Sequence, residues 1–150
     1  MDQPFRPLRD GVTYREHTAD LWVEARGKDI EEVVNRLVNG LYGVIASSMN
    51  VKGEGVRKEI QGEGPDLETA LVELLSEVLY MFDAGPYVVV ESIVSVERGE
   101  KWDRINLSGK WYEFEIPEEH MGMEIKAVTY HGTEIRKEGR EMVAKVLLDL

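Results

Sequence analysis

The chain has 150 residues, a length typical of one domain built around a single hydrophobic core. Hydrophobic residues make up 43% of it, too many for a disordered chain. The net charge of −11, from 18 Lys and Arg against 29 Asp and Glu, disfavours tight, direct binding to a nucleic-acid backbone. The absence of cysteine excludes disulfides, thiolate metal sites and cysteine nucleophiles.

The sequence also bears on location. Its first residues, MDQPFRPLRDG, lack the apolar run of a signal peptide, and no stretch is apolar for long enough to span a bilayer. We therefore expect a cytoplasmic protein without a membrane partner.

The first third of the chain predicts an arm, a strand and a helix. Residues 1–10 carry two prolines and mixed charge, which is typical of a flexible or loosely docked arm. Residues 12–25 read as extended, because apolar and polar residues alternate over 21–25. Apolar residues then recur at helical spacing over 30–45, with Asp29 as N-cap and Glu32 three residues on, as in a capping box.

The middle of the chain predicts a glycine-rich turn region and a second helix. Residues 52–64 hold four glycines around a short polar strand at 56–61, and the spacing of the glycines is not that of a dinucleotide-binding loop. A broad apolar stripe over 67–82 predicts a helix that lies flat on a sheet or on the first helix. Pro65 suits its first turn, and residues 83–86 end it.

The remainder predicts strands. Residues 87–97 and 102–112 form a hairpin around a turn at 98–101, and 123–136 and 141–150 form another around a turn at 137–139. The order of elements favours a single-domain α+β fold over residues 1–150, with two amphipathic helices packed on a mainly antiparallel β-sheet.

The first candidate for chemistry is the segment His17-Thr18-Ala19-Asp20. Thr18 and Asp20 have low strand preference and interrupt an extended run. A loop or bulge that turns Asp20 toward a site would explain the interruption. The alternative is a local turn in which both side chains hydrogen-bond their own backbone.

The second candidate is Asp149, which ends a strongly apolar strand beside the chain's terminal carboxylate. Carboxylates this close repel unless a cation or hydrogen-bond donors hold them, and such hard oxygen ligands favour Ca²⁺ or Mg²⁺. The alternative is a frayed, solvated terminus. If Asp20 and Asp149 are to meet, the strands at the two ends of the chain must be neighbours.

The third candidate is the segment 124–131, EIKAVTYH, in which a lysine lies in a β-rich, apolar stretch. Lys126 could pair with a carboxylate or meet a phosphate, or it could reach solvent from a sheet edge. His17, His120 and His131 lack the close spacing of a zinc protease motif. No nucleophile, phosphate-loop or RNA-binding motif is present.

Taken together, HTADL at 17–21, the helix over 71–80, EIKAVTYH at 124–131 and the Asp149 ending resemble the archease family. The resemblance runs from about Tyr14 to Leu150, and EIKAVTYH at this distance from HTAD is its most specific part.

The resemblance implies a function. Archeases are accessory proteins of the RNA ligase that joins tRNA halves in tRNA splicing; they promote its guanylylation by GTP and its multiple turnover. It implies a divalent metal of the calcium type on Asp20, Asp149 and Leu150, a role for Lys126 in activating the ligase, and lesser roles for His17 and His131. It implies no catalysis by the chain alone.

Two other functions remain open from the residues. One is a stand-alone Mg²⁺-dependent phosphoesterase whose carboxylates activate water. The other is a small chaperone-like binding module with an exposed apolar patch.

Overall fold

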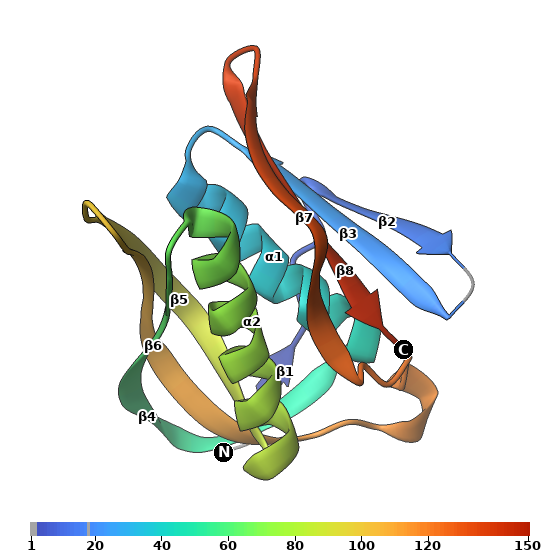
Figure 1. Cartoon of the computed structure of the whole chain (residues 1–150). Coiled ribbons are helices and arrows are strands. Elements are labelled where there is room, and N and C mark those ends of the chain that lie inside the picture. The colour runs from blue at the N-terminus through green and yellow to red at the C-terminus, as the bar shows by residue number, and fades with distance from the viewer. Residues whose placement is uncertain (1–2, 18) are drawn as a thin grey trace.

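The computed structural model describes residues 3–17 and 19–150. Figure 1 shows an α+β fold of two helices and two antiparallel sheets. The elements in chain order are β1 (Gln3–Phe5), β2 (Val12–His17), β3 (Asp20–Gly27), α1 (Ile30–Ile45), β4 (Met49–Gly64), α2 (Leu67–Ala84), β5 (Tyr87–Arg98), β6 (Asp103–Glu115), a 3-10 turn (Glu118–His120), β7 (Ala127–Glu138) and β8 (Glu141–Asp149).

The strands form two four-stranded sheets rather than one. Their orders are β1-β4-β6-β5 and β2-β3-β8-β7, and every pairing is antiparallel. Helix α1 packs on β3 and β8 of the second sheet and on β5 of the first, whereas α2 packs on β4, β5 and β6 and reaches β7 (Figure 1). The helices therefore lie between the sheets, and the core forms where their apolar faces meet the inner faces of both sheets.

Helix α1 has the predicted limits and the predicted N-cap. The Asp29 carboxylate accepts a hydrogen bond from the Glu32 amide at 2.8 Å, an interaction typically worth about 1 kcal/mol. The Glu32 carboxylate in turn accepts a hydrogen bond at 3.1 Å from the amide of Lys28, the residue before the cap. Nine α1 residues are buried, as the apolar stripe predicts.

Helix α2 lies on a sheet, one of the two predicted arrangements, but Pro65 precedes the helix instead of lying in its first turn, and Asp66 is the N-cap. The Asp66 carboxylate accepts a hydrogen bond from the Thr69 amide at 2.7 Å, and hydrogen bonds from the Thr69 side chain and then from this amide lower the pKa of Asp66. Gly62 of β4 fixes how closely the helix approaches, because a Cβ there would lie 2.1 Å from the Ala70 carbonyl oxygen.

Four sequence predictions about strand limits need correction. Residues 52–64 belong to one 16-residue strand, β4, which continues through a bulge between Lys52 and Val56 because Gly53 and Gly55 both adopt φ of +76°. The extended run at 12–25 is two paired strands, one ending at His17 and the next beginning at Asp20; Ala19 lies in a turn, and Thr18 lies outside the described residues. Strand β7 begins at residue 127 rather than 123, and β6 continues to residue 115 rather than ending at 112.

The predicted flexible arm is docked in the part that the structure describes. Residues 3–5 pair with β4 as strand β1, and Phe5 packs edge-on against the buried Tyr42 with ring centroids 6.0 Å apart. Among the described residues, neither helix is both long and apolar enough to cross a membrane.

Candidate functional site

The candidate site forms where β3 begins and β8 ends. These strands are neighbours, as the sequence requires, and Asp20 is the direct cross-strand partner of Asp149. Leu21 and Leu148, the next pair, are 2% and 0% exposed, so they face the core. Because side chains alternate along a strand, Asp20 and Asp149 share the outer face of the sheet, where directly opposite Cβ atoms are about 5 Å apart.

The end of the chain is held at the same place. The Leu150 amide donates to the Ala19 carbonyl oxygen at 3.0 Å, and the partly buried Leu150 side chain packs against the core. A frayed, solvated terminus, the alternative reading of this segment, does not describe that arrangement. The main chain of Leu150 is therefore held near the two aspartates.

Lys126 reaches this place from a third direction. Its amide donates to the Asp149 carbonyl oxygen at 2.8 Å, and the next residue, Ala127, is the cross-strand partner of Asp149 in β7. The Lys126 side chain is exposed, while the preceding Ile125 is 4% exposed and anchors the segment. We call Asp20, Asp149, Leu150 and Lys126 the carboxylate corner.

The two candidate histidines differ in what the structure says of them. His17 pairs with Asp20 through the backbone, but its side chain lies outside the described part of the structure. His131 is exposed and lies in an irregular part of β7, where five residue steps, from Thr129 to Glu134, span only two of β8. It therefore lacks the regular pairing expected of a strand over residues 123–136.

The chemistry of the donors fits a hard divalent cation. Two carboxylates oppose each other directly, and neither forms an ion pair or hydrogen bond with another described side chain. Within residues 3–17 and 19–150, no three His, Cys, Asp or Glu side chains form a metal-ligand group. A cation here would therefore depend on the Asp20 and Asp149 carboxylates and on main-chain oxygen of Leu150, all oxygen ligands of the kind that Ca²⁺ and Mg²⁺ prefer.

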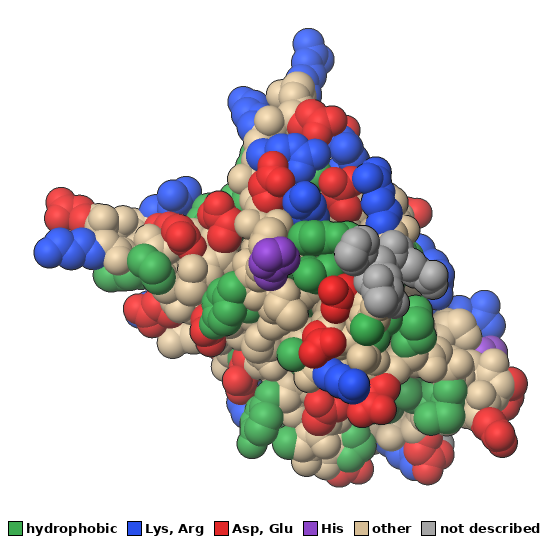
Figure 2. All heavy atoms as spheres, turned by 45° about the vertical axis from the view of Figure 1, so that its right-hand side comes forward, with side chains coloured by type: hydrophobic (Ala, Val, Ile, Leu, Met, Phe, Trp, Pro, Cys, Tyr) green, Lys and Arg blue, Asp and Glu red, His purple; other side chains and the backbone are tan. Residues whose placement is uncertain are grey.

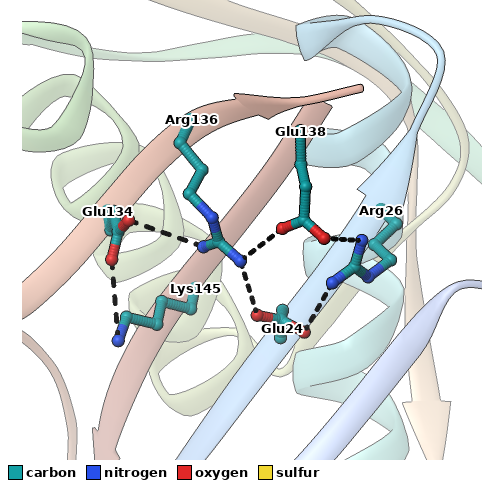
Figure 3. Close-up of polar contacts among 6 residues, drawn as sticks. All are labelled: Glu24, Arg26, Glu134, Arg136, Glu138 and Lys145. Atoms are coloured by element: carbon teal, nitrogen blue, oxygen red, sulfur yellow. Dashed lines mark hydrogen bonds and ion pairs between the residues drawn. The ribbon is translucent and has the colours of Figure 1, made fainter. Parts of the chain in front are cut away.

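The same outer face carries a charged network that the sequence analysis did not identify. Figure 3 shows Glu24, Arg26, Glu134, Arg136, Glu138 and Lys145 linked across three strands. Arg136 contacts Glu138 at 2.8 Å and Glu24 at 3.7 Å, and Lys145 contacts Glu134 at 3.6 Å. Hydrogen bonds from Arg136 and then Arg26 lower the pKa of Glu138.

This network differs from the corner in its electrostatics. Its three acidic and three basic groups neutralise one another, whereas the two aspartates of the corner have no described counterion. On β3, Trp22 lies between Asp20 of the corner and Glu24 of the network. The Lys145 ammonium group lies over the Trp22 ring, 4.7 Å from its centroid. Figure 2 shows the contrast on one face, with basic and acidic side chains interleaved over the projecting β7–β8 hairpin and more acidic than basic ones below it.

Comparison with known proteins supplies the family. The sequence pattern of the archease protein family (MTH1598/TM1083) matches residues 13–150. The chain belongs to the archease family. It is 38% identical over 142 residues to the archease of Methanosarcina mazei, covering 91% of this chain and 94% of that one. It is 36% identical over 135 residues to the archease of Pyrococcus abyssi, covering 87% and 93%.

Two solved structures share the archease fold found here. The solution structure of Methanobacterium thermoautotrophicum protein 1598 superposes with a TM-score of 0.74 at 26% identity, covering 93% of this chain and 99% of that one. The crystal structure of a Thermotoga maritima protein, described as an archease and possible chaperone, superposes with a TM-score of 0.56 at 21% identity, covering 91% and 94%. The second likeness concerns the fold alone.

Proposed function

We propose that this archease activates an RNA ligase that joins tRNA halves, and that it does so through the carboxylate corner. The activation consists of faster guanylylation of the ligase by GTP and faster multiple turnover. The family supports this proposal, because the resemblance that implies ligase activation rests on the segments that meet at the corner. The chain itself is an activator in the cytoplasm and does not catalyse ligation.

The observation that carries the proposal is the pairing of Asp20 with Asp149. These two residues, 129 positions apart in sequence, are half-buried and opposite each other on the outer face of the sheet, with no described counterion to balance them. Directly opposed like charges destabilise a sheet by roughly 0.2–1 kcal/mol. A site that binds a cation explains this arrangement, because the cation balances the repulsion that the apoprotein tolerates.

Each residue of the corner then has a distinct role. Asp20, Asp149 and main-chain oxygen of Leu150 hold the divalent cation, which is calcium in this proposal. A cation held there would supply positive charge for phosphate oxygens. Lys126 presents a second, flexible positive charge beside it, and an ammonium group meets phosphate as a point charge.

The charge of the chain supports a protein partner over nucleic acid. A net charge of −11 repels a phosphate backbone, so direct contact with RNA is weak or absent in this proposal. An RNA ligase has a basic substrate groove, and an acidic activator docks beside it by complementary charge.

The test is RNA ligation with the ligase at a concentration far below that of its tRNA halves, with GTP, and with or without this protein. We expect a large rise in turnover that is lost in Asp149→Asn and in Lys126→Ala. Asp10→Asn is the matched control, because Asp10 is exposed and lies outside the corner. Full stimulation by the folded Asp149→Asn and Lys126→Ala proteins would remove the corner from the mechanism.

A chaperone-like module is the second candidate. The exposed side chains of Met121 and Met123, 64% and 42% accessible, favour it. That function predicts that the protein suppresses aggregation of unfolded clients without ligase or metal. Hydrolysis of simple phosphoesters by the protein alone would instead support the hypothesis of a Mg²⁺-dependent phosphoesterase.

A further inference from the structure

The segment between β6 and β7 is held firmly although it contains little regular structure. We call residues 118–126 the strap; in Figure 1 the segment after β6 passes the lower right of the molecule and comes close to the C-terminus. The Gly122 and Met123 amides donate to carbonyl oxygens of α1 at 2.7 and 2.9 Å, and the His120 carbonyl oxygen accepts from the Ser47 amide at 2.9 Å. The Lys126 amide completes the attachment at the carboxylate corner.

A close backbone approach and one buried side chain hold the strap as well. A Cβ at Gly122 would lie 2.3 Å from the Val44 carbonyl oxygen, so the strap approaches α1 as closely as a backbone can. Ile125 is buried in the core. The backbone of the strap is therefore ordered before any partner arrives, which reduces the entropy lost on binding.

This ordered backbone presents two exposed apolar side chains. Met121 is 64% exposed and Met123 is 42% exposed. Tyr130, which follows the strap, is 57% exposed and donates a hydrogen bond to Glu73 on α2, where Tyr80 is 62% exposed. Exposed apolar groups that gather in one region mark interaction sites, and methionine adapts its shape to varied partners.

The charges around these groups are acidic. Glu118, Glu119 and Glu124 lie on the strap, and Lys126 is its one basic residue apart from His120. Asp83, at the end of α2, has a raised pKa because of partial burial and the negative charge of Glu124. The region thus joins apolar anchors to a negative potential, and it adjoins the corner.

We propose that the strap is the surface by which this protein docks on the ligase, and that its methionines enter apolar sockets within a basic protein surface. This inference rests on the proposed function and adds the contact face to it. Docking there brings Lys126 and the carboxylates to the partner together, because the strap and the corner share one backbone. The strap determines affinity, while the corner determines how much a bound ligase is stimulated.

The test separates affinity from maximal stimulation. The double variant Met121→Gln, Met123→Gln removes the apolar anchors, and Glu124→Lys reverses a strap charge. The matched controls are the double variant Val56→Gln, Ile93→Gln, at side chains 68% and 69% exposed on β4 and β5, and a charge reversal at the exposed Glu100. Ligation rate is measured against activator concentration, with calorimetric binding to the purified ligase and thermal melting of every variant.

The expected result is a rise of about ten-fold or more in half-saturating concentration for each strap variant, with the maximal rate unchanged. The controls keep the wild-type curve, and Asp149→Asn lowers the maximum instead. If wild-type protein stimulates the ligase and the strap variants match it, the inference is wrong and the proposed function stands. If wild-type protein neither binds nor stimulates the ligase, both the inference and the proposed function are wrong. A dimer of this chain that the methionine variant dissociates would also overturn the inference, because the strap would then bind a second copy.

Discussion

Replacing Asp149 by Asn should make the metal-free protein more stable and abolish its stabilisation by calcium. Asp20 and Asp149 are direct cross-strand partners on the outer face of the sheet, with no described counterion. The substitution keeps the shape of the side chain and removes one of two opposed negative charges. It also removes one of the oxygen ligands proposed for the cation.

Simple electrostatics gives the size of the first effect. Two unit charges about 5 Å apart repel by about 0.8 kcal/mol in water. For a chain of this length, 1 kcal/mol changes the melting temperature by roughly 2–4 °C. Asp149→Asn should therefore raise the melting temperature of the apoprotein by about 2–3 °C at low salt, and less at high salt because ions screen exposed charges.

The second effect is larger and has the opposite sign. Calcium at one hundred times its dissociation constant stabilises the folded wild type by about 2.7 kcal/mol. That corresponds to a rise of roughly 5–10 °C in melting temperature. Asp149→Asn should lose most of that rise, so calcium reverses the order of stability of the two proteins.

The assay is thermal unfolding followed by circular dichroism, with chelator or with millimolar calcium. Asp10→Asn is the control for net charge, because it changes the total charge equally at an exposed residue outside the corner. An equal calcium-induced rise in wild type and Asp149→Asn would refute the assignment of this carboxylate as a ligand. No change in the apoprotein would refute the repulsion argument.

Three further predictions concern the fold. Gly62→Ala should lower the unfolding free energy by several kcal/mol in chemical denaturation, because its Cβ meets α2 backbone at 2.1 Å, whereas Gly53→Ala, in open space at φ +76°, should cost only about 1 kcal/mol. Tyr42→Phe should cost about 1–3 kcal/mol, because the buried Val89 amide loses the acceptor it contacts at 3.0 Å; equal stability would show that the amide finds another partner. Burial raises the pKa of Tyr42 above its ordinary value near 10, so the neutral ring stabilises the fold below pH 10 and that contribution falls as pH rises above it; Tyr42→Phe should flatten this alkaline decline in urea titrations.

The helices were predictable because their signals are local. An apolar stripe at helical spacing and an aspartate at the N-cap define the start of α1, and the structure confirms its limits at Ile30 and Ile45. The long strand β4 was not predictable, because its glycines are typical of turns. They form a bulge instead, and only pairing with β6, which is distant in sequence, keeps them in a strand.

The pairing that brings Asp20 and Asp149 together was predictable, but the surroundings of these residues were not. Pairing of the strands that contain Asp20 and Asp149 was required by the metal hypothesis, and the structure confirms the pairing. The strap was predicted as strand from residue 123. The alternation of apolar and polar residues does not reveal that the Gly122 and Met123 amides donate hydrogen bonds to α1. The exposure of Met121 and Met123 was not predicted, since sequence alone does not report exposure.

The most direct test of the central claim is the rate at which GTP guanylylates the ligase in a single turnover, without RNA. The account predicts that wild-type protein with calcium accelerates this step, that Asp149→Asn and Lys126→Ala do not, and that Asp10→Asn acts like wild type. Equal acceleration by all four proteins would contradict the claim that the carboxylate corner performs the activation.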